Sequence, residues 1–143
     1  MVSFTITLTV LLASTLVLIF GFLGGLHVYW AAGGRRWLEG VAPEIKGKAA
    51  FKPPKAATIA VAIGLFGFGV LALLLAFPPS MDLPLQTFGW VAAAIFLLRA
   101  IGEFRYVGFF KRHRSTTFGK RDTLIYSPLC LFISLLFVFL LTL

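Results

Sequence analysis

The feature that most constrains the fold is an apolar run without a charged residue, from about Phe4 to Trp30. An α-helix rises about 1.5 Å per residue, so about 20 residues cross a hydrocarbon core of about 30 Å. A signal peptide does not fit, because no Lys or Arg precedes the run and its apolar part would span only about 7–15 residues. The run therefore predicts a retained transmembrane helix.

Three further apolar runs follow, separated by Gly, Pro and charged residues. Of the 143 residues, 59% are hydrophobic and 13% charged, against roughly 25% charged in a soluble domain. A soluble chain of this length could not bury so much apolar surface, and the alternation of barrel strands is missing. We predict one all-α domain, an integral membrane four-helix bundle over residues 1–143, with spans at residues 4–30, 57–77, 85–109 and 123–142.

Lys and Arg gather on one side of these spans. Six lie between residues 31 and 56, six between Arg105 and Arg121, and the thirteenth, Arg99, lies in the third run. The positive-inside rule then places loops 31–56 and 110–122 in the cytoplasm and both termini outside it. The expected location is a membrane that the chain crosses several times, with the basic loops on its cytoplasmic side.

The net charge of +8 is explained by attraction to the anionic inner leaflet. No nucleic-acid motif accompanies it, so we expect membrane lipids as partners and no nucleic acid. A homo-oligomer or a membrane-protein partner stays open. The residues expected to contact lipid headgroups are Arg35, Arg36, Arg105, Lys111 and Arg112.

Small residues recur at four-residue spacing in three of the runs, which favours close helix packing. They serve either packing within one bundle, which we favour, or a dimer face. The residues are Gly21, Gly24 and Gly25 in the first run, Ala56, Ala60 and Gly64 in the second, and Gly89 and Ala93 in the third.

Pro128 interrupts the fourth run. One alternative is a helix capped by Asp122 or Thr123 and kinked at Pro128. The other is a helix that begins with Ser127 as its cap and Pro128 as its first residue. We favour the kinked helix, because the second alternative leaves only about 16 residues, or about 24 Å.

Polar side chains within apolar runs are costly and tend to mark function. Arg99 and Glu103 are one turn apart, so they are predicted to pair within one helix, with Tyr106 on the same face. His27 and Tyr126 are expected at a similar depth in the first and fourth runs. His27, Arg99, Glu103, Tyr106 and Tyr126 are therefore candidates for a polar pocket on the cytoplasmic side.

Several roles fit this pocket. It could be a buried ion pair that fixes helix register, or a site for a small ligand, lipid or partner protein, which is our leading functional hypothesis. Alternatively, Glu103 and His27 could perform acid–base chemistry on a lipid-like substrate. A third hypothesis is a small transporter acting as a dimer. The catalytic residues and whether the protein is an enzyme stay open; no metal site or cofactor is expected.

Four segments carry a resemblance to a known family: residues 27–34 (HVYWAAGG), 42–44 (APE), 98–110 (LRAIGEFRYVGFF) and 122–130 (DTLIYSPLC). Together they resemble a family of small bacterial four-helix membrane proteins known only as a domain of unknown function. The resemblance covers nearly the whole chain. It implies a bacterial inner-membrane protein and supplies no activity, cofactor or catalytic residue.

Overall fold

The computed structural model describes residues 2–38, 41, 44–45, 48–49, 53–81 and 83–143. In this part of the chain the elements are α1 (Val2–Ala31), β1 (Glu44–Ile45), β2 (Lys48–Ala49), α2 (Lys55–Ala76), α3 (Leu85–Ile101), α4 (Thr117–Arg121), the π-helical turn η1 (Asp122–Tyr126) and α5 (Ser127–Thr142). The two short strands pair antiparallel. The last three helical elements form one continuous helix. An all-α chain built on four long helices is therefore confirmed.

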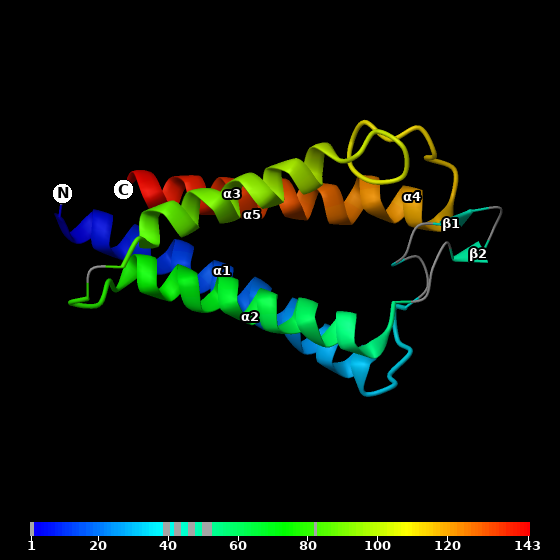
Figure 1. Cartoon of the computed structure of the whole chain (residues 1–143). Helices are drawn as coiled ribbons and strands as arrows, with labels where there is room; N and C mark the ends of the chain where they lie inside the picture. The colour runs from blue at the N-terminus through cyan, green and yellow to red at the C-terminus, as the bar shows by residue number, and fades with distance from the viewer. Residues whose placement is uncertain (1, 39–40, 42–43, 46–47, 50–52, 82) are drawn as a thin grey trace.

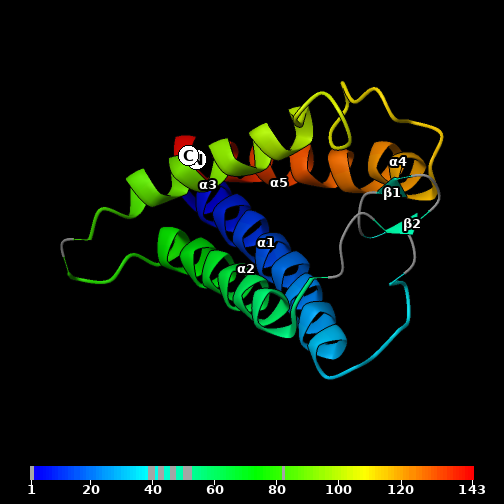
Figure 2. The ribbon, with the colours of Figure 1, turned by 45° about the vertical axis from the view of Figure 1, so that its right-hand side comes forward.

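The four long helices form two antiparallel pairs, α1 with α2 and α3 with α5. The pairs meet at one end and diverge toward the other, as both Figure 1 and Figure 2 show. The two chain ends and the turn between α2 and α3 lie where the pairs meet. We call this the terminal end. The described residues of the connections that follow α1 and α3 include Arg35, Arg36 and Lys111, and they lie at the opposite end, which we call the basic end.

The core centres on Phe20 of α1, whose side chain is fully buried. Its ring centroid lies 5.6 Å from that of Phe68 in α2, 5.5 Å from that of Phe96 in α3 and 6.0 Å from that of Phe137 in α5. Each long helix thus contributes one ring. Lipid provides no hydrophobic drive for helices to associate, so direct packing of this kind must hold the two pairs together.

The glycines of α1 fall into two groups. Gly24 is buried, and a Cβ there would lie 2.7 Å from the Phe66 ring of α2. A Cβ at Gly21 or Gly25 would meet nothing within 4 Å. The close contact between α1 and α2 therefore depends on Gly24, and the Gly21-x-x-x-Gly25 pattern lies outside that contact.

The small residues of the other helices divide in the same way. Ala56, Ala60 and Gly64 of α2 are exposed. Gly89 of α3 is buried, and a Cβ there would lie 2.7 Å from Leu141 in α5. Ala93 is also buried, and its carbonyl accepts a hydrogen bond of 2.8 Å from the Ser134 hydroxyl of α5. Small residues thus pack α3 against α5, as the sequence pattern predicts for a bundle.

Three helical segments are long and apolar enough to cross a membrane: Val2–Ala31, Lys55–Ala76 and Thr117–Thr142. The shorter α3 has 17 residues, or about 26 Å at about 1.5 Å per residue. It lies along α5 and connects the terminal end to the basic end (Figure 1). The chain is therefore a multi-pass membrane protein.

The helix predicted over residues 85–109 ends earlier, at Ile101. Gly102 follows it with φ of 84°, a conformation that glycine adopts at little cost. Its N–H donates to the carbonyl of Leu98 at 2.8 Å and closes the last turn. The chain then forms a tight loop over residues 102–116, drawn in yellow to orange at the basic end (Figure 1).

The helix predicted over residues 123–142 begins earlier than expected. Its first cap is Thr116, whose hydroxyl accepts a hydrogen bond of 2.9 Å from a backbone N–H three residues later. Pro128 has no N–H to donate, and the helix widens just before it into the π-helical turn η1. Asp122 and Ser127, both considered as caps, lie inside the helix.

Candidate site: a buried charge cluster at the basic end

Three charged side chains meet inside the α3–α5 pair at its basic end. Asp122 in η1 and Lys111 in the loop before α4 are buried. Lys111 Nζ lies 2.9 Å from Asp122 Oδ2, and Nη2 of Arg99 in α3 lies 2.8 Å from Asp122 Oδ1. We call Arg99, Lys111 and Asp122 the charge cluster.

The two fully buried members have a complete set of hydrogen bonds. Asp122 also accepts from the N–H of Gly108 at 2.8 Å and from the hydroxyl of Ser127 at 3.2 Å. Lys111 also donates to the carbonyl of Gly108 at 2.9 Å and to Oγ1 of Thr123 at 2.6 Å. With Asp122 this makes three acceptors for the three protons of the ammonium group. A buried ion pair is stable only when its remaining groups are satisfied in this way.

Arg99 differs from the other two members. Its side chain is 34% exposed, whereas those of Lys111 and Asp122 are 0% exposed. Its Nη1 atom is buried and has no hydrogen-bond partner among the described residues. The cluster contains two cations and one carboxylate, so its formal charge is +1. An unpaired buried donor is costly, and an anion placed beside Arg99 would remove both the unpaired donor and the excess charge.

The loop after α3 brings the cluster together. Gly108 has φ of 90°, and a Cβ there would collide with the carbonyl of Ile101. The N–H of Phe109 donates to the carbonyl of Ala100 at 2.9 Å, so the loop returns to the end of α3. This turn places the N–H of Gly108 and the ammonium of Lys111 over Asp122. Two glycines, at 102 and 108, make the path possible.

The predicted pair of Arg99 with Glu103 in one helix is wrong. Arg99 pairs with Asp122, 23 residues away in the sequence. Because α3 ends at Ile101, Glu103 lies in the loop, where its side chain is exposed. Its Oε1 accepts a hydrogen bond of 3.0 Å from the backbone N–H of Tyr106.

The aromatic candidates lie outside the cluster. The Tyr106 ring stacks on His113 with centroids 4.8 Å apart, and the guanidinium carbon of Arg105 lies 5.3 Å from its centroid. Tyr126 is part of η1, and its ring centroid lies 6.1 Å from that of Phe118. Both tyrosines thus belong to the basic end of the α3–α5 pair.

His27 belongs to the other helix pair. Its Nδ1 lies 2.7 Å from the carbonyl of Leu23 in its own helix, and the edge of the ring faces Trp30 at 5.1 Å. The pair of α1 and α2 diverges from α3 and α5 toward this end (Figure 2). Of the five residues predicted to line one pocket, only Arg99 belongs to the charge cluster.

The predicted headgroup contacts are exposed with one exception. Arg35, Arg36, Arg105 and Arg112 are exposed at the basic end, and their contact with lipid stays a prediction. Lys111 is buried, with its ammonium fully bonded, so its predicted contact with headgroups is wrong. Ala42 and Pro43 of the segment 42–44, and Lys46 and Lys52 among the six basic residues between 31 and 56, lie outside the described residues.

The sequence did not single out Asp122 as a functional residue, although a signal was present. It is one of only five acidic residues, and it directly precedes a run of about 20 mostly apolar residues. Its position at the start of that run suggested a helix cap instead. Among the described residues, no three His, Cys, Asp or Glu side chains gather as a metal ion would need.

Comparison with known proteins identifies the family to which the chain belongs. Residues 20–137 match the family model described as "Protein of unknown function (DUF3995)". No curated protein and no solved structure matches the chain. The matched range begins inside α1, ends inside α5 and contains the whole charge cluster.

Proposed function

Because the chain belongs to the DUF3995 family, whose function is unknown, we propose a role from its own geometry. The protein is a multi-pass membrane protein that binds the anionic headgroup of a membrane lipid at its basic end. The observation that carries this proposal is the buried Nη1 of Arg99, which has no partner among the described residues and adjoins a cluster of formal charge +1.

The chemistry of Arg99 fits a phosphate group. A guanidinium presents donors in a planar fork that matches two oxygens of a phosphate, and bonds between ionised partners are about twice as strong as neutral ones. Nη2 already binds Asp122 and Nη1 is buried without a partner among the described residues, so a headgroup that uses Nη1 would have to displace the side chains that cover it. The nearby loop adds Arg105 and Arg112, both exposed, which would raise the local concentration of anions.

Depth in the membrane favours a lipid over a free anion. Arg99 lies 14 residues beyond Leu85, the first residue of α3, or about 21 Å along the helix axis. This is about two-thirds of a hydrocarbon core of about 30 Å, near the leaflet of the basic end. The proposed location is the bacterial cytoplasmic membrane with the basic end inside, where anionic lipids are concentrated.

The test is lipid binding by purified protein in neutral detergent, followed by native mass spectrometry. We expect phosphatidylglycerol to bind in preference to phosphatidylcholine, and Arg99→Gln to weaken phosphatidylglycerol binding about tenfold, as the loss of one charge-assisted bond would. Asp122 keeps Lys111 in this variant, so the fold should persist. Lys120→Gln is the control, because it removes one positive charge from an exposed position at the same end that the proposal does not use.

Two outcomes would contradict the proposal. If Arg99→Gln lowers thermal stability but keeps the full preference for phosphatidylglycerol, the cluster is structural only. If inorganic phosphate alone displaces the lipid at equal concentration, the ligand is a free anion. Catalysis by Glu103 and His27 is not proposed, because His27 lies in α1 and Glu103 in the loop after α3, at the end where the two helix pairs diverge.

A further inference from the structure

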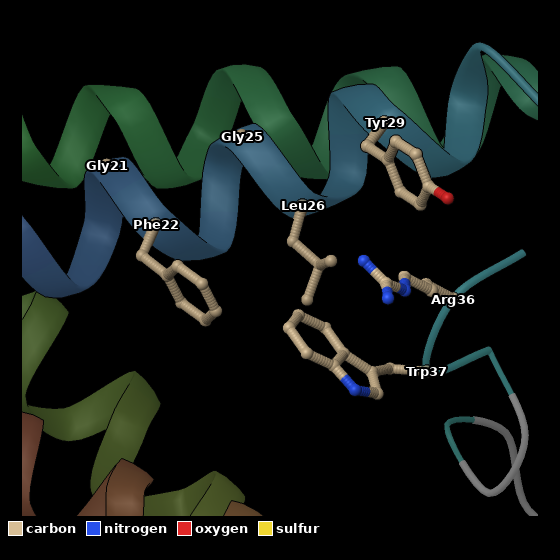
Figure 3. Close-up of a pocket in the computed structure, with 7 residues that line it drawn as sticks. All are labelled: Gly21, Phe22, Gly25, Leu26, Tyr29, Arg36 and Trp37. Atoms are coloured by element: carbon tan, nitrogen blue, oxygen red, sulfur yellow. The ribbon is translucent and has the colours of Figure 1, made fainter. Parts of the chain in front are cut away.

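A second feature of the basic end lies on the other helix pair. It is a hollow of about 390 Å³ on the surface of α1, within the range of about 300–1,000 Å³ typical of ligand pockets. Its lining residues are Gly21, Phe22, Gly25, Leu26, Tyr29, Arg36 and Trp37 (Figure 3). None of them belongs to the charge cluster.

The floor of the hollow is formed by two glycines one helical turn apart. Nothing lies within 4 Å of the place where a Cβ of Gly21 or Gly25 would stand. Phe22 and Leu26, which follow them in the sequence, rise beside this floor (Figure 3). The glycines are not needed for contact with α2, which uses Gly24. The groove they leave is open to whatever surrounds α1.

The chain beyond α1 folds back to close one end of this groove. The N–H of Gly34 donates to the carbonyl of Tyr29 at 3.0 Å, and Nε1 of Trp30 donates to the carbonyl of Arg36 at 2.8 Å. Trp37 has φ of 60°, which is unusual for a residue other than glycine. Its ring centroid lies 6.4 Å from that of Phe22. The turn thus holds an indole against the groove in a costly conformation.

Arg36 is the single charged residue in the lining. Figure 3 places its guanidinium between Tyr29 and Trp37, at the end of the groove nearest the basic loops. No described residue accepts a hydrogen bond from this guanidinium. Tyr and Trp prefer the interface between hydrocarbon and headgroups, and Arg reaches toward phosphates from the same depth. The groove therefore changes along its length from apolar to cationic.

We infer that this hollow binds one phospholipid with an anionic headgroup. The acyl chain lies along the Gly21–Gly25 floor beside Phe22 and Leu26, and Arg36 binds the phosphate. The apolar part of the groove lies toward the membrane centre and Arg36 lies at the basic end. The acyl chain and the phosphate of a lipid follow the same order within a leaflet. This site is independent of the function proposed for Arg99, because it is built by α1 and the turn that follows it.

Quenching of tryptophan fluorescence by brominated lipids tests this inference. A Trp90→Phe protein keeps Trp30 and Trp37, both at the basic end of α1. In phosphatidylcholine vesicles, a small fraction of phosphatidylglycerol with brominated acyl chains should quench more than the same fraction of brominated phosphatidylcholine. One basic residue near the headgroups supplies about fivefold enrichment of the anionic lipid. Arg36→Gln should abolish the difference.

Gly25→Leu places a side chain on the floor of the groove and should also abolish the difference in quenching between the two brominated lipids. Gly64→Leu is the matched control, because Gly64 is an exposed helical glycine of α2 with nothing within 4 Å of its Cβ position. Arg99→Gln should leave the quenching unchanged, which separates this site from the charge cluster.

Equal quenching by the two brominated lipids would overturn the inference. So would stronger quenching by brominated phosphatidylglycerol that persists in Gly25→Leu. A third outcome is weak quenching by both lipids together with crosslinked dimers that are lost in Gly25→Leu. It would contradict the inference and identify a second copy of this chain as the occupant of the hollow.

Discussion

Asp122 is the residue that connects the two cations of the charge cluster with the loop after α3. Its carboxylate is the shared counter-charge of Arg99 and Lys111, and it also binds the backbone of the loop at Gly108. Loss of Asp122 would leave the buried Lys111 and the partly exposed Arg99 without a counter-ion. Loss of Lys111 would still leave Asp122 paired with Arg99. The two buried residues are partners, yet their removal has unequal consequences.

We therefore predict that Asp122→Leu destabilises the protein far more than Lys111→Met. Removing one partner of a buried ion pair costs about 3–5 kcal/mol when a charge is left unpaired. Lys111→Met should cost at most about 2 kcal/mol, because it removes hydrogen bonds but leaves no uncompensated charge. Thermal unfolding in detergent measures both, with Lys120→Met, an exposed position, as the control. Equal losses for the two buried variants would contradict this account.

Arg99 could be recognised from the sequence, whereas its partner could not. A charged residue inside an apolar run is conspicuous because lipid makes it costly. Helical spacing then favoured Glu103 as the partner, but Gly102 ends the helix before that spacing applies. The actual partner, Asp122, follows a loop that folds back over the end of α3 and contains two glycines with positive φ. Helical periodicity relates residues within one helix, so it could not predict a contact that a loop brings about.

At the scale of helices, the sequence predicted their number and approximate positions well, because the bilayer demands long apolar segments. It predicted their ends poorly. Gly102 is a typical residue after a helix C-terminus, but the aromatic residues beyond it resembled a continuing span. Small residues were identified as packing elements, yet the spacing could not show that Gly24, and not Gly21 or Gly25, faces α2.

Neighbouring glycines of α1 should therefore respond differently to substitution. Gly24→Leu would force a side chain into the Phe66 ring and should destabilise the α1–α2 pair by about 1–3 kcal/mol, as overpacking usually does. Gly21→Leu enters open space and should not lower stability. The comparison uses the same residue change three positions apart in one helix, measured by thermal unfolding. A larger loss for Gly21→Leu would mean that α1 packs through its other face.

At the scale of the whole molecule, the segregation of charge predicts the orientation. Both termini lie at the terminal end, and the described part of the basic end contains two of the basic clusters, around Arg35 and Arg112. A reporter that is active only outside the cytoplasm should therefore be active when fused after Leu143. The same reporter inserted after Ser115 should be inactive, and a fluorescent protein there should fold. Activity of the periplasmic reporter at Ser115 would reverse the orientation.

The divergence of the two helix pairs has a consequence for the surrounding bilayer. The four rings around Phe20 join the pairs, and beyond that junction their axes separate. Placed across a bilayer, a body of this form would act as a wedge and would exclude unequal areas from the two monolayers. The elastic energy of a flat membrane around it then depends on the shapes of neighbouring lipids, so bilayer curvature alone would change where the protein is most stable.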